Sequence, residues 1–580
     1  MFSPKNKMDL DTLRHSCSHI MAQAVKELWP EAKLGIGPSI EDGFYYDFDK
    51  KEPFTDEDLG KIENAMQKII AKNEPFIREE LGKLEAAALF KKLKEGYKVE
   101  LIEALPDERV SIYKTGRDFI DLCRGPHINS TGEIRAFKLL SVAGAYWHGI
   151  ETNPMLQRIY GTCFETQKEL DEYLKNLEEA KLRDHRKLGP ALELFDIYHE
   201  EAGAGFVFYH PKGALLRTII EDYEKKEHLK RGYQLVITPH VMQAELWKTS
   251  GHYDYYRENM YSFKIEDKEY VIRPMNCPGH ILIYKSKTRS YRDLPIRFFE
   301  LGTVYRHEKA GVLHGLLRVR GFTQDDAHIF CLPEQLRDEI KGVIDFVFDT
   351  MKVFGFGEVG IELSTRPAKS IGSDEDWQLA TAALEEALKE KGLKYDINEG
   401  DGAFYGPKID IKLKDALKRK WQCATIQCDF ALAKRFDLSY IDSEGKERQP
   451  IMLHRVLLGS LERFIGALIE HYKGDFPLWL APTQIEVIPI KDTAQEYALK
   501  VKQRLEENDV RAEVDSHQET LNKRIRNAEI NKIPYCLVVG EREAKEGNVS
   551  VRKRIKGDMG VVPLEDFIKQ IKEEIDNKSA

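Results

Sequence analysis

The first part of the chain repeats apolar residues with the period of a helix. Over residues 12–28 the apolar positions recur every three or four residues: Leu13, Cys17, Ile20, Met21, Ala24 and Leu28. This spacing predicts one amphipathic helix. A densely charged helical pattern covers residues 166–187, and Gly189-Pro190 is expected to end it because proline cannot continue a helix. We therefore predict a first α+β domain with a linker helix over residues 1–188.

Two further regions follow. In residues 189–478 a long helix over 213–232 precedes a strand at 234–238, and later strands alternate with helices at 335–352 and 375–391. Around residues 405–410 and 421–430 polar residues alternate with apolar ones, which predicts a sheet with one polar, pocket-lining face. Residues 479–580 alternate short apolar strands with helices, which is typical of a small α/β domain with a mostly parallel sheet.

Composition restricts the class of protein. The 580 residues are 42% hydrophobic and 32% charged, as in globular proteins, and a chain of this length has roughly three or four domains. No apolar run approaches membrane-spanning length, and the N-terminal residues lack the apolar core of a signal peptide. Eight cysteines without paired spacing point to a reducing compartment. We therefore predict a cytoplasmic protein with no membrane partner.

The charge pattern bears on nucleic-acid binding. A net charge of −9 argues against indiscriminate binding, although a basic groove can still be local. The last region concentrates cations in this way: Lys523, Arg524, Arg526, Lys532, Arg542, Arg552, Lys553 and Arg554. They form either an ordinary solvated surface or a surface that recognises unpaired RNA bases.

Histidines and a cysteine in the first region are spaced for a shared site. His15 and His19 lie four residues apart on the predicted helix and so share one face. Cys123 and His127 flank a Gly-Pro turn that can bring them together. Either pair alone is more often an ordinary polar feature, but both pairs in one region favour a metal or hydrolytic site.

Residues 273–331 hold the densest group of reactive side chains, with Cys277 in a turn near the start. An apolar strand pattern leads to Arg306, and a second pattern returns through Phe322 after a loop with glycine and cations. Arginine pairs phosphate oxygens bidentately and keeps its charge, so we predict a β-hairpin that binds a polyphosphate nucleotide. The side chains expected to face it are Arg306, Glu308, Arg318 and Phe322.

Three motifs together resemble those of the class II aminoacyl-tRNA synthetases. The helix, strand and proline at residues 213–239 resemble motif 1, the dimer element of the class. The segment from Arg306 to Phe322 resembles motif 2, and the segment from Gly459 to Arg463 resembles motif 3. The resemblance covers essentially the whole chain.

Three shorter segments are similar to the threonyl-tRNA synthetase family in particular: 275–279, 325–328 and 452–455. The resemblance implies an α+β multidomain protein. It consists of an α+β editing domain (1–188), a class II catalytic domain with an antiparallel sheet (189–478) and an α/β anticodon-binding domain (479–580). Bacterial members of the family usually begin with a small ubiquitin-like domain, and this chain begins where the editing domain should, so we expect it to lack that domain.

The resemblance implies ATP-dependent attachment of L-threonine to tRNA(Thr) through threonyl-adenylate, by a homodimer with Mg²⁺ on ATP and one Zn²⁺ per subunit. The implied zinc ligands are Cys277, His328 and His454. The implied ATP-binding residues are Arg306, Glu308, Arg318, Phe322, Gln422 and Arg463. Threonine is expected to contact Asp326, Tyr405, Gln422 and Gln427. Catalysis is expected to involve Arg306, Arg463, His252 and Lys408.

A site built for the threonine hydroxyl explains why a second site is expected. Valine has no hydroxyl, so it leaves the polar groups of such a site unpaired and is rejected strongly. Serine lacks only a methyl group, and the binding free energy lost with that methyl is roughly 1–3 kcal/mol. The residues that match the editing site of the family are His15, His19, Tyr46, Lys98, Asp121, Cys123 and His127. They are expected to hydrolyse seryl-tRNA(Thr) by positioning a water, with or without a metal. Anticodon contacts are expected at Glu543 and Arg552.

Other functions are compatible with parts of the pattern. Within the class, a prolyl- or seryl-tRNA synthetase is the nearest alternative, but a proline site has no use for a zinc that reads a hydroxyl. In a non-catalytic RNA-binding paralogue, Arg306 or Arg463 is expected to be replaced by another residue, and both arginines are present. A zinc hydrolase built on the histidine and cysteine pairs alone leaves the other two domains unexplained.

Overall fold

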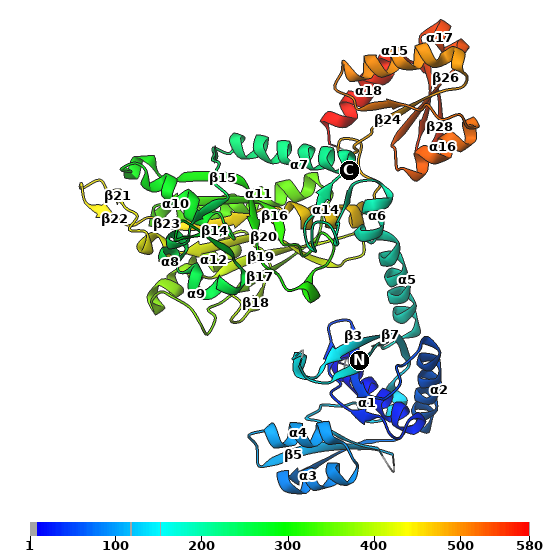
Figure 1. Ribbon diagram of the computed structural model, residues 1–580, viewed down its shortest axis with the longest axis vertical. Coiled ribbons are helices and arrows are strands. Elements are labelled where there is room, and N and C mark those ends of the chain that lie inside the picture. Colours follow the sequence, from blue (N-terminus) through cyan, green and yellow to red (C-terminus); the bar gives the residue numbers. More distant parts are fainter. Residues whose placement is uncertain (1–8, 117–118, 151, 579–580) are drawn as a thin grey trace, which may run out of the picture. The chain divides into compact units, whose positions relative to one another are not determined.

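The computed structural model describes residues 9–116, 119–150 and 152–578 (Figure 1). Two compact units are distinguished by their internal contacts, residues 1–179 and residues 180–580. Each unit has its own buried apolar core. Among the described helices, none is both long and apolar enough to cross a membrane.

A five-stranded antiparallel sheet forms the core of the first unit. Its order is β1-β3-β8-β7, with β2 paired to β3. The strands are β1 (Lys33–Leu34), β2 (Ser39–Ile40), β3 (Gly43–Asp49), β7 (Ala136–Tyr146) and β8 (Met155–Phe164). Helix α1 (Leu10–Leu28), predicted from its apolar spacing, packs against β3, β8 and helix α2 (Asp56–Lys72) and buries Cys17 and Ile20 completely.

A smaller part of the same unit holds a three-stranded antiparallel sheet with two helices. Its elements are β4 (Phe76–Gly82), α3 (Lys83–Lys92), α4 (Gly96–Ala104), β5 (Arg109–Thr115) and β6 (Phe119–Leu122). Their apolar side chains form a separate cluster around Phe90 and Ile112. Because Cys123 directly follows β6, this sheet carries one half of the histidine and cysteine group, and α1 carries the other half.

The linker breaks earlier than the sequence predicted. Helix α5 (Gln167–Arg183) is followed directly by a second helix, α6 (His185–Ala191). Asp184 separates them because its carboxylate caps the new helix and accepts a hydrogen bond from the amide of Arg186. Pro190 was expected to end the linker helix, but it lies in the last turn of α6. There its missing N–H costs a single backbone hydrogen bond of a short helix.

An eight-stranded, largely antiparallel sheet is the centre of the second unit. Its order is β11-β15-β16-β23-β20-β19-β17-β18, and only the two outermost pairs are parallel. The strands are β11 (Gln234–Leu235), β15 (Ile296–Tyr305), β16 (Gly321–Cys331), β17 (Val359–Ser364), β18 (Asp396–Asn398), β19 (Lys408–Lys414), β20 (Lys420–Asp429) and β23 (Ile451–Val456). β15 and β16 form the predicted hairpin, with Tyr305 opposite Gly321 at the end where the connecting loop begins. The expected antiparallel catalytic sheet is thus confirmed.

Long helices complete this layer: α7 (Pro211–Lys230), α11 (Leu336–Val353), α12 (Asp374–Glu390) and α14 (Leu461–Tyr472). Their apolar faces share one core with the sheet, through residues such as Leu216, Ile340 and Phe464. The side chain of Ser460 caps α14 by accepting from the amide of Arg463. This cap places the motif 3 arginine in the first turn of the helix.

The last part of the chain folds as a five-stranded sheet of order β25-β24-β26-β27-β28. Its strands are β24 (Ile485–Pro489), β25 (Ala512–Val514), β26 (Tyr535–Val539), β27 (Asn548–Lys553) and β28 (Gly557–Pro563). Two pairings are parallel and two are antiparallel, so the expectation of a mostly parallel sheet was wrong. The reason is that the connections between the antiparallel neighbours are short, residues 540–547 and 554–556, whereas parallel neighbours need a crossover of about a dozen residues.

Candidate functional sites

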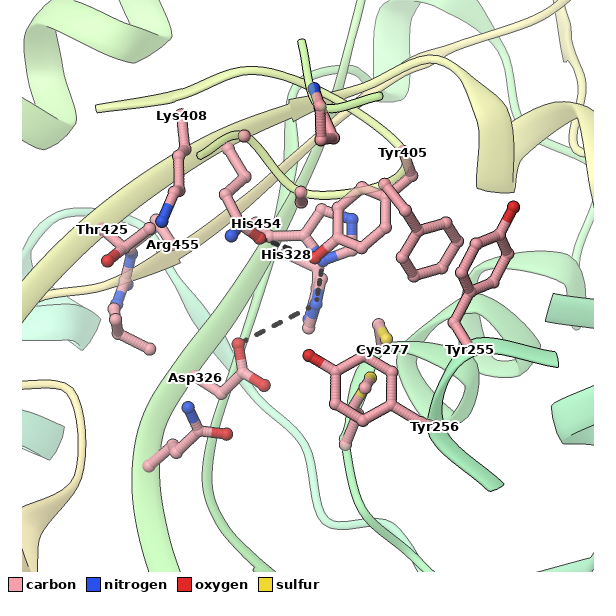
Figure 2. A pocket seen from close by; sticks show the side chains of 18 of the residues that line it. Tyr255, Tyr256, Cys277, Asp326, His328, Tyr405, Lys408, Thr425, His454 and Arg455 are labelled. Atoms are coloured by element: carbon pink, nitrogen blue, oxygen red, sulfur yellow. Dashed lines mark hydrogen bonds and ion pairs between the residues drawn. The ribbon is translucent and has the colours of Figure 1, made fainter. Parts of the chain in front are cut away.

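A pocket of about 650 Å³ opens over the polar face of the eight-stranded sheet (Figure 2). Side chains from β16, β19, β20 and β23 line it, together with the segments 255–256 and 401–405. The alternation of polar and apolar residues along β19 and β20 had predicted a polar face of this kind.

Cys277, His328 and His454 meet at this pocket although they are far apart in the sequence. Strands β16 and β23 are neighbours, and their register places His328 opposite His454. Cys277 is the first residue of α10 (Cys277–Lys285). Nε2 of His328 lies 3.0 Å from Nδ1 of His454, and all three candidate ligand atoms lie within 4.8 Å of one another. A thiol and two imidazole nitrogens beside an open pocket form a donor set that suits Zn²⁺ with one free position.

Each of the two histidines has its second ring nitrogen bonded within the protein. Nε2 of His454 lies 2.7 Å from Oδ2 of Asp429, and Nδ1 of His328 lies 2.8 Å from Nδ1 of His280. His280 also contacts Oε2 of Glu300 through Nε2, at 3.1 Å. Such partners hold the rings in place, so the two nitrogens that face each other are presented as ligands. Asp429, His280 and Glu300 were not predicted from the sequence, since no motif spacing relates them to the two histidines.

Burial sets the charge of this group. The thiol of Cys277 is enclosed, which raises its pKa well above the ordinary value. Burial lowers the pKa of His328 well below its ordinary value, so the ring is neutral. A neutral imidazole is the form that binds a metal, and a bound cation favours the thiolate over the thiol. The group is therefore suited to hold a cation.

Three of the residues expected to contact threonine lie in the same pocket. Asp326 is two residues from His328 on β16 and accepts a hydrogen bond from Nδ2 of Asn276 at 2.9 Å. Burial raises the pKa of Asp326. The hydroxyl of Tyr405 donates to Oε1 of Gln427 at 2.6 Å. Asp326 and Tyr405 lie beside the candidate zinc ligands in Figure 2, and Gln427 lines the same pocket.

Lys408 and Gln422 differ in their relation to the pocket. Lys408 lines it, and its Nζ lies 3.0 Å from Asp401 and 2.9 Å from Asp410. Gln422 is not among the lining residues, and its side chain donates to Oδ1 of Asp410 at 2.9 Å. The carbonyl of Gln422 accepts from Nη1 of Arg463 at 3.4 Å. In the structure, Gln422 therefore lies nearer to the motif 3 arginine than to the residues that are expected to contact threonine.

His252 is buried behind the pocket rather than lining it. Nδ1 of His252 lies 2.8 Å from the hydroxyl of Ser250, and the ring lies 6.2 Å from the ring of Tyr405. Burial lowers the pKa of His252 to about 3. The imidazole is therefore neutral, and its Nε2 has no hydrogen-bond partner among the described residues.

Arg306 and Phe322 lie at the loop end of the β15–β16 hairpin. Arg306 lines the pocket, and its Nε donates to the carbonyl of Pro274 at 3.1 Å. The guanidinium carbon lies 5.2 Å from the centre of the Phe322 ring. The predicted hairpin thus brings a cation and an aromatic face together, as a nucleotide site requires.

Arg318 and Arg463 are the other two arginines expected to bind ATP. Both make contacts within or to the loop that joins β15 and β16. Arg318 is exposed and pairs with Oε2 of Glu308, with Nη2 at 3.0 Å. Nε of Arg463, in the first turn of α14, donates to the carbonyl of Leu317 at 3.1 Å. Motif 2 and motif 3 are therefore joined directly by a hydrogen bond in this structure.

The pocket also contains residues that the sequence analysis missed: Tyr256, Met275 and Gln324. Gln324 could have been found, because alternation along a strand places it on the same face of β16 as Asp326 and His328. Tyr256 and Met275 belong to no periodic pattern that points to this pocket.

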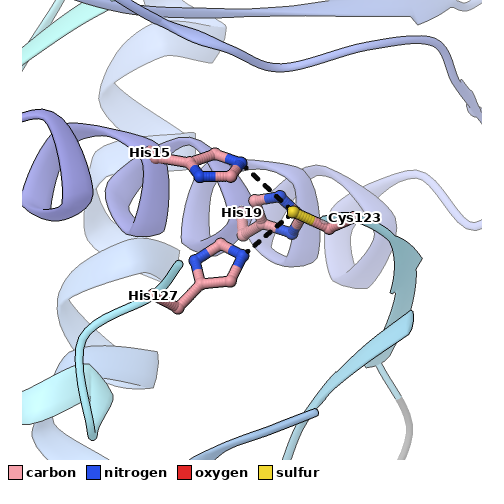
Figure 3. A group of neighbouring side chains, drawn as sticks. All are labelled: His15, His19, Cys123 and His127. Carbon is pink, nitrogen blue, oxygen red and sulfur yellow. Dashed lines mark hydrogen bonds between the residues drawn. The ribbon is translucent and has the colours of Figure 1, made fainter. Parts of the chain in front are cut away.

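Figure 3 shows that His15, His19, Cys123 and His127 face one another in the first unit. Sγ of Cys123 lies 3.3 Å from Nε2 of His15 and 3.3 Å from Nε2 of His127. One candidate ligand atom from each of the four lies within 4.8 Å of all the others. The shared helix face and the Gly-Pro turn thus bring the two pairs together as the sequence analysis expected.

Asp121 connects the remaining predicted residues of this unit. Its carboxylate lies 2.5 Å from the hydroxyl of Tyr46, 2.5 Å from Nζ of Lys98 and 3.2 Å from Nδ1 of His19. Nζ of Lys98 also donates to the Tyr46 hydroxyl at 2.9 Å. Lys98 would be expected on the surface from its sequence context alone, but it is buried and takes part in this network.

Burial keeps the four-residue group uncharged. It raises the pKa of Cys123 to about 11 and lowers the pKa of His127 to about 2. It lowers the pKa of His15 and of His19 as well. A protonated thiol and three neutral imidazoles can orient a water or bind a metal, but they provide no thiolate nucleophile.

The predicted anticodon residues lie on different elements. Glu543 is on α17 (Glu541–Glu546), where its Oε2 accepts from the amide of Gly540 at 2.9 Å. Arg552 is on β27 and partly exposed. Of the cations in this region, Arg524 is buried and bonded to Asp515, so it belongs to the core rather than to a basic surface.

A third group, Asp184, His185 and Glu470, also has candidate ligand atoms within 4.8 Å of one another. Nδ1 of His185 lies 2.6 Å from Oε1 of Glu470, and Nε2 accepts from the amide of Leu316 at 3.0 Å. Both ring nitrogens are therefore engaged by the protein itself.

Comparison with known families agrees with this geometry. Residues 261–472 match the tRNA synthetase class II core domain (G, H, P, S and T), and residues 484–574 match the anticodon binding domain. Residues 110–160 match the threonyl and alanyl tRNA synthetase second additional domain. With the antiparallel sheet and the hairpin arginines, these matches define a class II aminoacyl-tRNA synthetase.

Relatives identify the member of the class. The chain is 57% identical to a threonine–tRNA ligase of Citrifermentans bemidjiense, over 99% of this chain and 90% of that protein. It is 58% identical to one of Syntrophotalea carbinolica, over 98% of this chain and 89% of that protein. The chain therefore belongs to the threonine–tRNA ligases, which join L-threonine to tRNA(Thr) with ATP and Mg²⁺, and it carries the editing domain of that family.

Solved structures agree with this assignment. The RNA binding domain of threonyl-tRNA synthetase from Cryptosporidium parvum Iowa II matches with a TM-score of 0.66 and 42% identity, over 67% of this chain and 98% of that chain. A putative threonyl-tRNA synthetase, ThrRS-1, from Aeropyrum pernix matches with a TM-score of 0.60 and 30% identity, over 69% of this chain and 97% of that chain. The resemblance inferred from the sequence is thereby confirmed.

Proposed function

We propose that Cys277, His328 and His454 bind one Zn²⁺ per subunit and that this metal selects threonine. The observation that carries the proposal is the meeting of three suitable ligand atoms within 4.8 Å at the wall of the pocket. Cys277, His328 and His454 would hold the metal, and Zn²⁺ bound there would supply Lewis acidity towards the polar groups of threonine. Asp429 and His280 orient the two imidazoles, as outer partners of metal ligands commonly do.

Asp326, Tyr405 and Gln427 form the polar wall around threonine. Asp326 accepts the hydrogen of the threonine hydroxyl, while the amide of Asn276 holds the other side of the carboxylate. Valine has no hydroxyl, so it leaves this carboxylate unpaired in a buried site and is rejected strongly. Serine keeps the hydroxyl, and the pocket alone discriminates against it only weakly.

The hairpin and motif 3 hold ATP. Arg306 binds the α-phosphate and stabilises the charge that develops as pyrophosphate leaves. Arg318 and Arg463 hold the outer phosphates with Mg²⁺, Phe322 stacks on the adenine, and Glu308 orients its amino edge. Support comes from the contacts among these residues at the loop end of the hairpin.

Lys408, Gln422 and His252 assist around the adenylate. Lys408 lines the pocket and, with Gln427, contacts the bound adenylate. Gln422 acts on the ATP side, because its carbonyl is bonded to Arg463. His252 helps to move the proton of the ribose hydroxyl during transfer to tRNA. Support for this role comes from the neutral ring and from its Nε2, which has no hydrogen-bond partner among the described residues.

The test of this assignment is pyrophosphate exchange dependent on the amino acid. Threonine is expected to support the fastest exchange, serine a slower one, and proline and valine almost none. Equal exchange with valine would show that no hydroxyl-reading group operates in the pocket.

The group in the first unit hydrolyses seryl-tRNA(Thr). A water held among His15, His19, Cys123 and His127 attacks the ester carbonyl, and the bond to the ribose oxygen breaks to release serine and tRNA. Asp121, bonded to Tyr46 and Lys98, orients His19. The same four donor atoms suit a metal, and metal analysis of the Cys123→Ser variant distinguishes a metal-held water from one held by the side chains alone.

We place the domains at 1–188, 189–478 and 479–580, with Glu543 and Arg552 at the anticodon. The protein acts as a homodimer through the segment that follows α7. Support for this interface comes from Ile237, which is 92% exposed, and from its exposed apolar neighbours Leu235 and Val241.

A further inference from the structure

We infer that His185, in the linker helix α6, is a positioning residue for the ATP site: its ring joins Glu470 to the amide of Leu316 and so holds the motif 2 loop in place. The inference rests on the proposed role of that loop in binding ATP. It does not depend on zinc or on the editing site.

The ring of His185 is completely buried and both of its nitrogens are engaged. Nδ1 lies 2.6 Å from Oε1 of Glu470, which also accepts from the backbone amide of His185 at 3.2 Å. Nε2 accepts from the amide of Leu316 at 3.0 Å. A neutral imidazole has one donor and one acceptor, so the carboxylate and the amide together specify which nitrogen carries the proton.

The loop approaches this ring very closely. The tight turn at 314–318 is closed by a hydrogen bond from the amide of His314 to the carbonyl of Arg318, at 3.1 Å. Gly315 has a φ of +48°, and a Cβ added to it would lie 2.2 Å from Nε2 of His185. Glycine is therefore required both by the backbone conformation and by the contact with the histidine.

Three consecutive residues of the turn are held by three different groups. His185 holds the amide of Leu316, Arg463 holds the carbonyl of Leu317 at 3.1 Å, and Glu308 pairs with the side chain of Arg318. Arg463 and Glu470 lie on the same helix, α14, about two turns apart. Helix α14 thus holds the loop directly at one point and through His185 at the other.

Metal binding by the same three residues is the competing interpretation. Neither nitrogen of His185 has a free lone pair directed at Asp184 or Glu470, because Nδ1 carries the proton and Nε2 accepts from the amide. The second oxygen of Glu470 is 2.7 Å from Nη2 of Arg419. The acidic groups are therefore already paired within the protein.

Replacing His185 by asparagine or by glutamine tests the two contacts of the ring separately. In His185→Asn the side chain reaches only the position of Nδ1, so it can bond Glu470 but leaves the buried amide of Leu316 without an acceptor. In His185→Gln the amide oxygen reaches the position of Nε2 and can accept from Leu316. His199→Asn, at an exposed histidine of the same unit, is the matched control.

Steady-state pyrophosphate exchange in the full-length protein is expected to show a KM for ATP that is about tenfold higher in H185N than in wild type. A tenfold change corresponds to the free-energy cost of leaving one buried amide without a hydrogen-bond partner. The KM for threonine stays within about twofold of wild type, because the threonine wall is made by other elements. H185Q recovers most of the affinity for ATP, and H199N is unchanged. An equal rise of both KM values, or an unchanged KM for ATP in H185N, would overturn the inference.

Hydrogen exchange without ATP tests the contact independently of the ATP assignment. The amide of Leu316 is expected to exchange faster in H185N than in H185Q or H199N. Faster exchange with an unchanged KM for ATP would leave the contact in place and remove the loop from the ATP site. Loss of one metal equivalent from H185Q relative to wild type would instead establish a metal site and overturn the positioning role.

Discussion

The two histidines at the candidate zinc site use different ring nitrogens. Asp429 is bonded to Nε2 of His454, so Nδ1 of His454 remains for the metal. His280 is bonded to Nδ1 of His328, so Nε2 of His328 remains for the metal. Carboxylate and imidazole partners of this kind decide ring orientation in metal sites. Residue types alone do not specify this choice, because either nitrogen of a histidine can bind a metal.

Cys277→Ser is expected to lose the bound zinc and to lower threonine-dependent pyrophosphate exchange by roughly 100-fold or more, because the hydroxyl is a poor replacement for a thiolate ligand. Metal analysis and exchange assays on the same preparation measure both effects. Cys331→Ala, at a buried thiol of β16 outside the group, should retain the metal. Full exchange activity in a zinc-free C277S preparation would contradict the zinc proposal.

Cys123→Ala is expected to leave threonylation intact and to let seryl-tRNA(Thr) accumulate, because Cys123 contacts two of the three histidines of the proposed editing group and is not among the residues that line the pocket of the second unit. Deacylation of preformed seryl-tRNA(Thr) measures the loss directly. Cys163→Ala, at a buried thiol of β8 in the same unit, is the control for packing. Deacylation at the wild-type rate in C123A would remove the group from the editing reaction.

At the scale of elements, the order of the strands assembles the active site. The hairpin β15–β16 carries the motif 2 arginine, and β23 lies beside β16 although a long stretch of chain separates them. Helix α14 then starts at the capping Ser460 and delivers Arg463 to the motif 2 loop. Each of these placements follows from a local signal, but their meeting follows from the sheet.

The segment after α7 is the element expected to form the dimer. Ile237→Asp should shift the protein from dimer to monomer, since an aspartate buried in an apolar interface without a partner is unfavourable. Light scattering coupled to size-exclusion chromatography measures the mass directly. Leu499→Asp, at an exposed apolar residue of helix α15 (Gln495–Glu506), is the control and should not change the mass. A dimeric I237D protein would place the interface elsewhere.

At the scale of the whole molecule, two units with separate cores are expected to unfold in two transitions. The first unit has a particular pH dependence, because burial lowers the pKa of His127 to about 2. The unfolded chain has its ordinary pKa of about 6.5, so between these values it binds one proton more than the folded unit. The free energy of unfolding therefore falls as the pH is lowered below about 6.5.

His127→Asn should make this acid destabilisation of the first unit shallower, by at most about 1.4 kcal/mol per pH unit. Calorimetry between pH 7 and pH 5 measures the shift of the transition assigned to that unit. His148→Asn, at an exposed histidine of the same unit, should keep the wild-type slope. An unchanged slope in H127N would mean that His127 is not held neutral in the folded protein.

Local patterns predicted much of this molecule. The spacing of apolar residues predicted α1 and the linker helix, and strand patterns around Arg306 predicted the β15–β16 hairpin. The break at Asp184 and the antiparallel half of the last sheet were not predicted. A capping carboxylate and a short connection override the simple expectations for proline and for alternating strands and helices.

The sequence by itself determined most helices and strands, the residue types available for chemistry and the family. Helical and strand periodicity and the synthetase motifs are local patterns, each contained in a short stretch of chain. Only the tertiary structure decided which of these residues meet. His328 and His454 are separated by 126 residues, and their contact depends on the neighbouring positions of β16 and β23. The burial of Lys98 and the contacts of His185 likewise arise from packing between distant segments, which no local pattern encodes.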